Sequence, residues 1–208
     1  MLADEPERWA ALGFAVCDGA AQIGSVRLGF TDPGAGRGIV SWSLRGVLGT
    51  ELDGLATRLS GSPVPAAAPE HPNGVVAIDH VVAISPALDR SVGALRAAGL
   101  DLRRVREEPT PAGAPRQAFF RLGAEILELV AEPEGVVQRS GGAQRPAHFW
   151  GLALRVSDLE RTVAVLGDHV GTIREAVQPG RRIATVRRSA GLAVPLALMS
   201  APAPAPVS

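Results

Sequence analysis

Two short segments in the middle of the chain alternate between apolar and polar positions as half-buried β-strands do. In residues 77–84, His80 has the alternation parity of three aliphatic residues, and in residues 125–130, Glu128 has the parity of two. Side chains two positions apart along a strand lie on the same face of a sheet. We therefore expect His80 and Glu128 on mostly apolar faces, where a carboxylate costs several kcal/mol unless a partner or a metal ion compensates it.

The residues between these strands complete a structural unit. Residues 88–98 have a helix-like pattern and end at Gly99, a common helix terminator. Residues 102–106 and 117–122 have the composition of two further strands. The order strand, helix, strand, strand, strand is thus predicted for residues 75–132.

The same order is predicted a second time, for residues 147–200. The helix start Leu88-Asp89-Arg90 recurs as Leu159-Glu160-Arg161, again after an apolar strand. The expected elements are a strand over 149–156, a helix ending near Gly171, and strands over 174–177, 182–188 and 192–199.

Residues 1–58 resemble a partial, degenerate copy of this module. A short helix over 7–12 precedes strands expected over 14–17, 23–30 and 38–47, and the opening strand is reduced to residues 1–3.

Proline-rich stretches separate and follow these modules. Residues 59–74 read as a Pro/Ala-rich linker in which His71 is expected to be exposed to solvent. Residues 201–208 read as a disordered tail.

Composition narrows the possible chemistry. The 208 residues carry no Tyr, and every basic residue except four His is Arg, so Schiff-base and phosphate-loop lysines are excluded. Catalysis by His, Glu, Asp, Arg or a metal ion is what the sequence allows.

Charge and cysteine content bear on the expected binding partners and cellular compartment. The formal net charge is zero, which gives no reason to expect nucleic-acid or membrane binding. Cys17 is the single cysteine and the acidic N-terminus does not resemble a secretory signal, so we expect a cytoplasmic protein.

With the repeat and the placement of His80 and Glu128, the chain resembles the vicinal oxygen chelate superfamily, which includes glyoxalase I, methylmalonyl-CoA epimerase, extradiol dioxygenases and bleomycin-resistance proteins. The matching segments are Ile78-Asp79-His80-Val81-Val82, the Leu88-Asp89-Arg90 helix start, residues 117–123 and Ile126-Leu127-Glu128-Leu129-Val130. The resemblance implies an α+β fold in which paired βαβββ modules form a cupped, open-barrel sheet. The partial module at the N-terminus would pack on it or mediate dimerisation, giving a possible homodimer.

The resemblance also implies a metal site. Family ligands come from the first and fourth strands of a module, sometimes with one from the third. At those positions stand His80, Glu128 and Gln117. This donor set suits a divalent ion such as Mn, Ni, Co, Fe or Zn. The second module departs from the pattern, because Gly151 and Ala197 occupy the positions equivalent to His80 and Glu128.

Two functions follow from this reading. The first is a metal-dependent lyase or isomerase that polarises two neighbouring oxygens of a small substrate, with Glu128, or Glu125 if Glu128 is ligated, transferring the proton. A dioxygenase is less favoured, since Gln117 stands where a second histidine ligand would.

The second function is metal-free binding of a small molecule, and an assembly module is a third possibility. Structural roles also remain open: an ion pair of Glu128 with Arg121, a core histidine at His80 and an edge-strand polar residue at Gln117.

Overall fold

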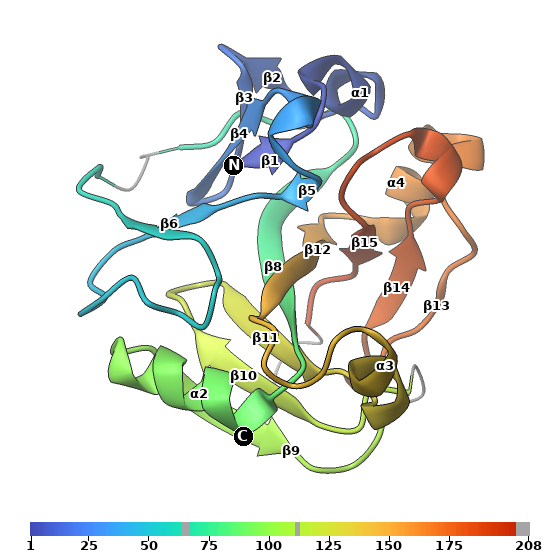
Figure 1. The fold of residues 1–208 in the computed structure, drawn as a ribbon. Helices are drawn as coiled ribbons and strands as arrows, with labels where there is room; N and C mark the ends of the chain where they lie inside the picture. The colour runs from blue at the N-terminus through green and yellow to red at the C-terminus, as the bar shows by residue number, and fades with distance from the viewer. Residues whose placement is uncertain (64–66, 111–112, 203–208) are drawn as a thin grey trace, which may run out of the picture. The chain divides into compact units, whose positions relative to one another are not determined.

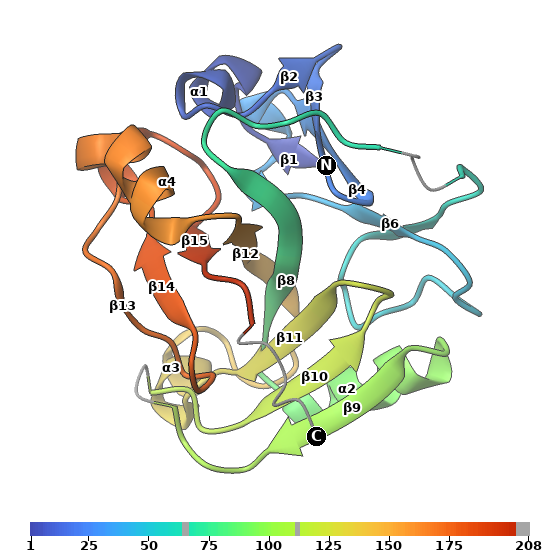
Figure 2. The ribbon, with the colours of Figure 1, turned by 180° about the vertical axis from the view of Figure 1, so that it is seen from behind.

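A computed structural model describes residues 1–63, 67–110 and 113–202. The chain divides into two compact units. Unit 1 contains residues 1–38, 64–79 and 152–208, and unit 2 contains residues 39–63 and 80–151. Figures 1 and 2 show the elements from opposite sides. No helix within the described ranges is long and apolar enough to cross a membrane.

Unit 2 is built around a βαβββ module. Strand β8 (Val75–Ser85) enters it at His80, and helix α2 (Leu88–Ala97) and strands β9 (Asp101–Arg106), β10 (Gln117–Arg121) and β11 (Ile126–Ala131) follow. In the sheet the order is β8-β11-β10-β9, with β8 parallel to β11 and the other pairs antiparallel. The predicted order of elements is confirmed for this module.

One face of this sheet forms the core of unit 2. Helix α2 covers that face (Figures 1 and 2) and contacts β9, β10 and β11. The fully buried residues include Ala83, Ala118, Phe120, Leu127 and Leu129. They have the alternation parity opposite to that of His80 and Glu128, so these two residues lie on the face of the sheet that α2 does not cover.

The remaining elements of unit 2 are short. Strands β6 (Trp42–Leu44) and β7 (Thr57–Leu59) pair in parallel, and helix α3 (Glu134–Arg139) follows the sheet. The indole Nε1 of Trp42 donates a hydrogen bond of 2.6 Å to Thr57 Oγ1. The continuous strand predicted over 38–47 is wrong, because residues 40 and 41 separate β5 (Gly38–Ile39) from β6 and the latter ends at Leu44.

Unit 1 contains the second module. Strand β12 (His148–Val156) continues into it and is followed by α4 (Leu159–Leu166), β13 (Arg174–Glu175), β14 (Arg182–Thr185) and β15 (Leu196–Met199). The order β13-β14-β15-β12 repeats that of the first module, with the last pair parallel. The predicted strand over 192–199 begins only at Leu196, because Pro195 has no N–H to donate to a neighbouring strand.

The N-terminal part of unit 1 contains the residues predicted to form the partial module. Strand β1 (Leu2–Ala3) pairs in parallel with β4 (Val26–Thr31), and α1 (Pro6–Ala11), β2 (Val16–Cys17) and β3 (Ala20–Ile23) complete it. The strand predicted over 23–30 is confirmed only from Val26, where β4 begins. Gly24 has φ +55°, so the chain turns there and β3 and β4 form a hairpin. Trp9 is fully buried, and its Nε1 donates a 3.0 Å hydrogen bond to Asp4 Oδ2.

His71 is buried, which corrects the expectation that it is exposed in a linker. Its side chain is 6% exposed. Nδ1 accepts a hydrogen bond from the Ala15 N–H at 2.9 Å, and Nε2 lies 3.0 Å from the carbonyl oxygen of Gln22. The imidazole therefore joins residue 71 to the N-terminal strands. Of the predicted linker, residues 64–66 lie outside the described residues, as do residues 203–208 of the predicted tail.

This burial predicts a pH-dependent stability. Burial lowers the pKa of the His71 imidazole below its usual 6.5. The unfolded chain then binds a proton at this position before the folded chain does, so the free energy of unfolding falls as the pH drops below about 6.5. Urea unfolding of wild type and His71→Gln between pH 7.5 and pH 5 should show a larger loss for wild type. Equal losses in the two proteins would contradict this.

Candidate metal centre

The pairing of β11 between β8 and β10 brings the predicted site residues to one face. Ile126 is opposite His80, two residues before Glu128 on the same face. Gln117 is opposite Val130, two residues after Glu128. All three predicted side chains therefore project from the face of the sheet that α2 does not cover.

The three side chains meet at Glu128. His80 Nε2 lies 3.2 Å from Glu128 Oε2, and the two side chains are 13% and 16% exposed. Gln117 is 8% exposed, and its amide Nε2 donates a hydrogen bond to Glu128 Oε1. The two carboxylate oxygens thus face different partners in a mostly water-excluded setting.

The donor set could hold a divalent cation. Ligands about 2.1 Å from one ion and at right angles to each other are about 3 Å apart, close to the measured separation of the imidazole nitrogen and the carboxylate oxygen. One neutral imidazole, one carboxylate and one amide also leave coordination positions for water or substrate. Across the described ranges, no three His, Cys, Asp or Glu side chains are grouped to hold an ion, so the third donor here is the Gln117 amide.

Arg121, the alternative partner of Glu128 named from the sequence, lies on the same face of β10 as Gln117 and Phe119. Arg121 Nε donates to the carbonyl oxygen of Gly123 at 3.2 Å. Glu125 lies in the turn before β11, where its own carbonyl accepts a hydrogen bond from the Leu122 N–H. The turn does not place Glu125 on the strand positions that carry the cluster.

Two further side chains extend the same face, and the sequence reading missed both. Phe119 of β10 is opposite Glu128, and Arg104 of β9 is opposite Phe119. The guanidinium carbon of Arg104 lies 5.0 Å from the centroid of the Phe119 ring. Their adjacency depends on the register of β9 against β10, which residue alternation does not fix.

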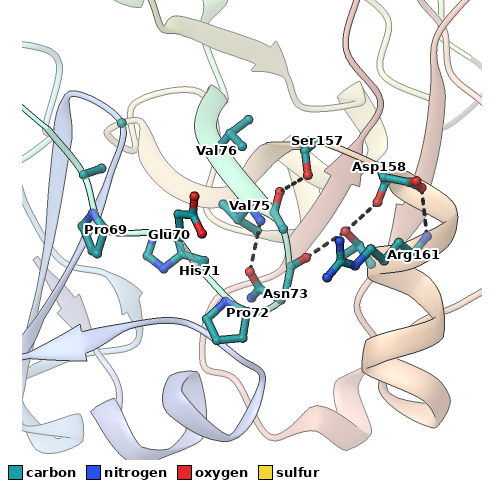
Figure 3. Close-up of a pocket in the computed structure, with 14 residues that line it drawn as sticks. Pro69, Glu70, His71, Pro72, Asn73, Val75, Val76, Ser157, Asp158 and Arg161 are labelled. Carbon is teal, nitrogen blue, oxygen red and sulfur yellow. Dashed lines mark hydrogen bonds between the residues drawn. The ribbon is translucent and has the colours of Figure 1, made fainter.

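Unit 1 has a cavity of about 640 Å³ where residues 68–76 meet residues 157–162 (Figure 3). Thr162 Oγ1 donates to the carbonyl oxygen of Asn73 at 2.8 Å, and Ser157 Oγ donates to that of Gly74 at 3.3 Å. Asp158 accepts from the Arg161 N–H and so caps α4. These hydrogen bonds join the residues that precede β8 to the first turn of α4, so we assign them a structural role.

Comparison with solved structures shows that the fold is similar to that of methylmalonyl-CoA epimerase. A selenomethionine crystal structure of methylmalonyl-CoA epimerase aligns with a TM-score of 0.50 and 18% identity, over 62% of this chain and 97% of that chain. The methylmalonyl-CoA epimerase of Mycobacterium tuberculosis aligns with a TM-score of 0.49 and 25% identity, over 63% and 91% of the two chains.

A variant of the Streptomyces coelicolor enzyme in complex with 2-nitronate-propionyl-CoA aligns with a TM-score of 0.49 and 22% identity, over 62% and 99% of the chains. No family model matches the sequence, and no curated protein matches it. The alignment with a TM-score of 0.50 confirms the resemblance drawn from the sequence for the fold alone.

Substitutions of two neighbouring residues of β11 should differ in their effect on the free energy of unfolding. Leu127 is fully buried in the core, so Leu127→Ala should lower the free energy of unfolding by about 2–5 kcal/mol. Glu128→Gln keeps the size and polarity of the side chain and should cost less than about 1.5 kcal/mol. Urea unfolding at pH 7.5 measures both. A cost for Glu128→Gln as large as that for Leu127→Ala would make Glu128 a structural residue.

Proposed function

We propose that this protein is a metal-dependent lyase or isomerase that binds a small oxygenated metabolite through two neighbouring oxygens. The observation that carries the proposal is the convergence of His80, Glu128 and Gln117 on one partly exposed sheet face. The methylmalonyl-CoA epimerase structures agree with isomerase chemistry in general kind. A shared fold does not set the reaction, so the proposal rests on the cluster.

The ion would be held by His80 Nε2 and Glu128 Oε2, the two atoms 3.2 Å apart. A bound divalent cation supplies Lewis-acid polarisation of the substrate oxygens, which favours loss of a proton from the adjacent carbon. His80 serves as a ligand in its neutral form, so acid should weaken metal binding.

Gln117 orients the carboxylate. Its N–H bond to Glu128 Oε1 leaves Oε2 directed at His80. Rotation of the amide by a half turn would instead present its oxygen, which is the ligand atom for a hard cation. Glu128 can accept the substrate proton at whichever oxygen is not ligated, and the low exposure of the pair keeps bulk water from competing.

Metal-free binding of a small molecule is the second candidate. The carboxylate of Glu128 already accepts a hydrogen bond from Gln117 and lies beside the His80 imidazole, which offsets part of its burial cost without an ion. The second module offers Gly151 and Ala197 at the equivalent positions, neither of which can ligate a metal. In this case the same sheet face would bind a ligand and catalyse no reaction.

Metal affinity separates the two candidates. We expect wild type to bind one Mn²⁺, Co²⁺, Ni²⁺ or Zn²⁺ per chain, and His80→Ala and Glu128→Ala to bind it at least about 100-fold more weakly because each removes a ligand. Gln117→Ala should lose about 10–100-fold, as expected for a residue that orients a ligand. Isothermal titration calorimetry on chelator-treated protein measures these affinities.

His169→Ala is the matched control. His169 lies in the 3₁₀ turn after α4 and is exposed, so its loss should leave the affinity unchanged. If wild type binds none of these ions, or if all four variants bind them equally well, the metalloenzyme proposal is wrong and the binding-protein candidate takes its place.

A further inference from the structure

The site face of unit 2 continues beyond the metal cluster in a straight row across three strands. Glu128 of β11 is opposite Phe119 of β10, and Phe119 is opposite Arg104 of β9. Adjacent strands are about 4.8 Å apart, so the backbones of Glu128 and Arg104 are separated by about 10 Å. An aromatic ring therefore lies between a carboxylate cluster and a cation.

A β-bulge produces this arrangement. Phe119 pairs with Arg104, whereas the next residue, Phe120, pairs with Leu102, so β9 holds one extra residue at this point. Phe120 is fully buried and Leu102 packs against the core, whereas Phe119 and Arg104 belong to the opposite face. Bulges of this kind redirect side chains and are common beside active sites.

Arg104 differs from the arginines near it in the groups that surround its guanidinium. Arg103 lies 3.2 Å from Asp101, Arg106 lies 3.8 Å from Glu108, and Arg116 binds both Asp89 and Glu107. Arg116 lowers the pKa of the Glu107 carboxyl through its hydrogen bond. Among residues 1–63, 67–110 and 113–202, Arg104 has no carboxylate within ion-pair distance, and its charge rests over the face of Phe119.

We propose that Arg104 binds a carboxylate at the far end of the substrate, while the cluster at Glu128 binds the two neighbouring oxygens. This deepens the proposed function and rests on it. The substrate class is an oxygenated acid with a second carboxylate several carbon atoms from the chelating oxygens, because the backbones of Glu128 and Arg104 are two strand spacings apart and the guanidinium lies over Phe119 between them. The chain between them would lie beside the Phe119 ring, whose face Arg104 covers.

A carboxylate fits this position better than a phosphate does. The planar guanidinium fork matches the two oxygens of a carboxylate, and one unpaired positive charge balances one negative charge. Phosphate sites in proteins draw on several donors, commonly a helix N-terminus or a glycine-rich loop. Arg104 lies in mid-strand, and the neighbouring arginines already hold carboxylates.

Two matched probes test the proposal. 2-Oxosuberate and 2-oxooctanoate have the same keto-acid head, but the distal carboxylate of the first is a methyl group in the second. Calorimetric titration with saturating Mn²⁺ at pH 7.5 should show wild type binding 2-oxosuberate about tenfold more tightly, as one charge-assisted contact provides. Arg104→Gln should lose this preference. Arg96→Gln should keep it, because Arg96 is an exposed arginine on α2, which covers the opposite face.

Three results would overturn the proposal: equal affinities of wild type for the two acids, no binding of either, or an unchanged preference in Arg104→Gln. Displacement of 2-oxosuberate by inorganic phosphate at lower concentration than by acetate would also overturn it, because it would make the position a phosphate site.

Repeating the titration without metal and with Glu128→Ala separates the two proposals. A preference that depends on Arg104 but persists in both conditions would support the carboxylate site and contradict chelation at the cluster. If the preference for 2-oxosuberate is absent without metal and absent in Glu128→Ala, and Mn²⁺ restores it in wild type, both proposals are supported.

Discussion

The register of β11 between β8 and β10 is the constraint on which both the core and the candidate site depend. Because side chains alternate with a period of two, one strand supplies Leu127 and Leu129 to the core and Glu128 to the other face. A slip by one residue would bury the carboxylate under α2 and expose two leucines. Burial of the leucines therefore fixes the position of Glu128, and the same pairing aligns His80 and Gln117 with it. The stability of the module and the geometry of the site come from one set of backbone hydrogen bonds.

The site face of the sheet differs from the core face in the burial of its side chains. Core residues such as Phe120 and Leu127 are fully buried, whereas His80 and Glu128 keep a small exposed fraction. A carboxylate in this position gains little stability for the fold, since desolvation offsets most of the attraction to its partners. The bulge at Phe119 and the arginine stacked on its ring likewise add little to the core. Features that cost free energy without strengthening a fold are typical of functional surfaces.

Much of the fold and of the candidate site could be predicted from the alternation of residues. The resemblance to the superfamily brought His80 and Glu128 together, and the register of β8 against β11 places them on one face. The recurrence of the Leu88 helix start at Leu159 predicted the second module. The predictions failed where one residue overrides the pattern: Gly24 follows the end of β3, and Pro195 delays the start of β15. His71 was misjudged because its partners, Ala15 and Gln22, are far away in the sequence. The row from Glu128 to Arg104 depends on a bulge, and bulges leave no mark in residue alternation.

We propose that His80 and Glu128 hold a divalent cation between them. The most direct measurement is a crystal structure of the protein grown with Mn²⁺, with diffraction recorded on both sides of the manganese absorption edge. If these residues bind the ion, we expect one anomalous manganese peak per chain, within about 2.3 Å of His80 Nε2 and of a Glu128 oxygen. Anomalous density elsewhere, or a Glu128 carboxylate bound only by His80 and Gln117 at saturating Mn²⁺, would contradict it.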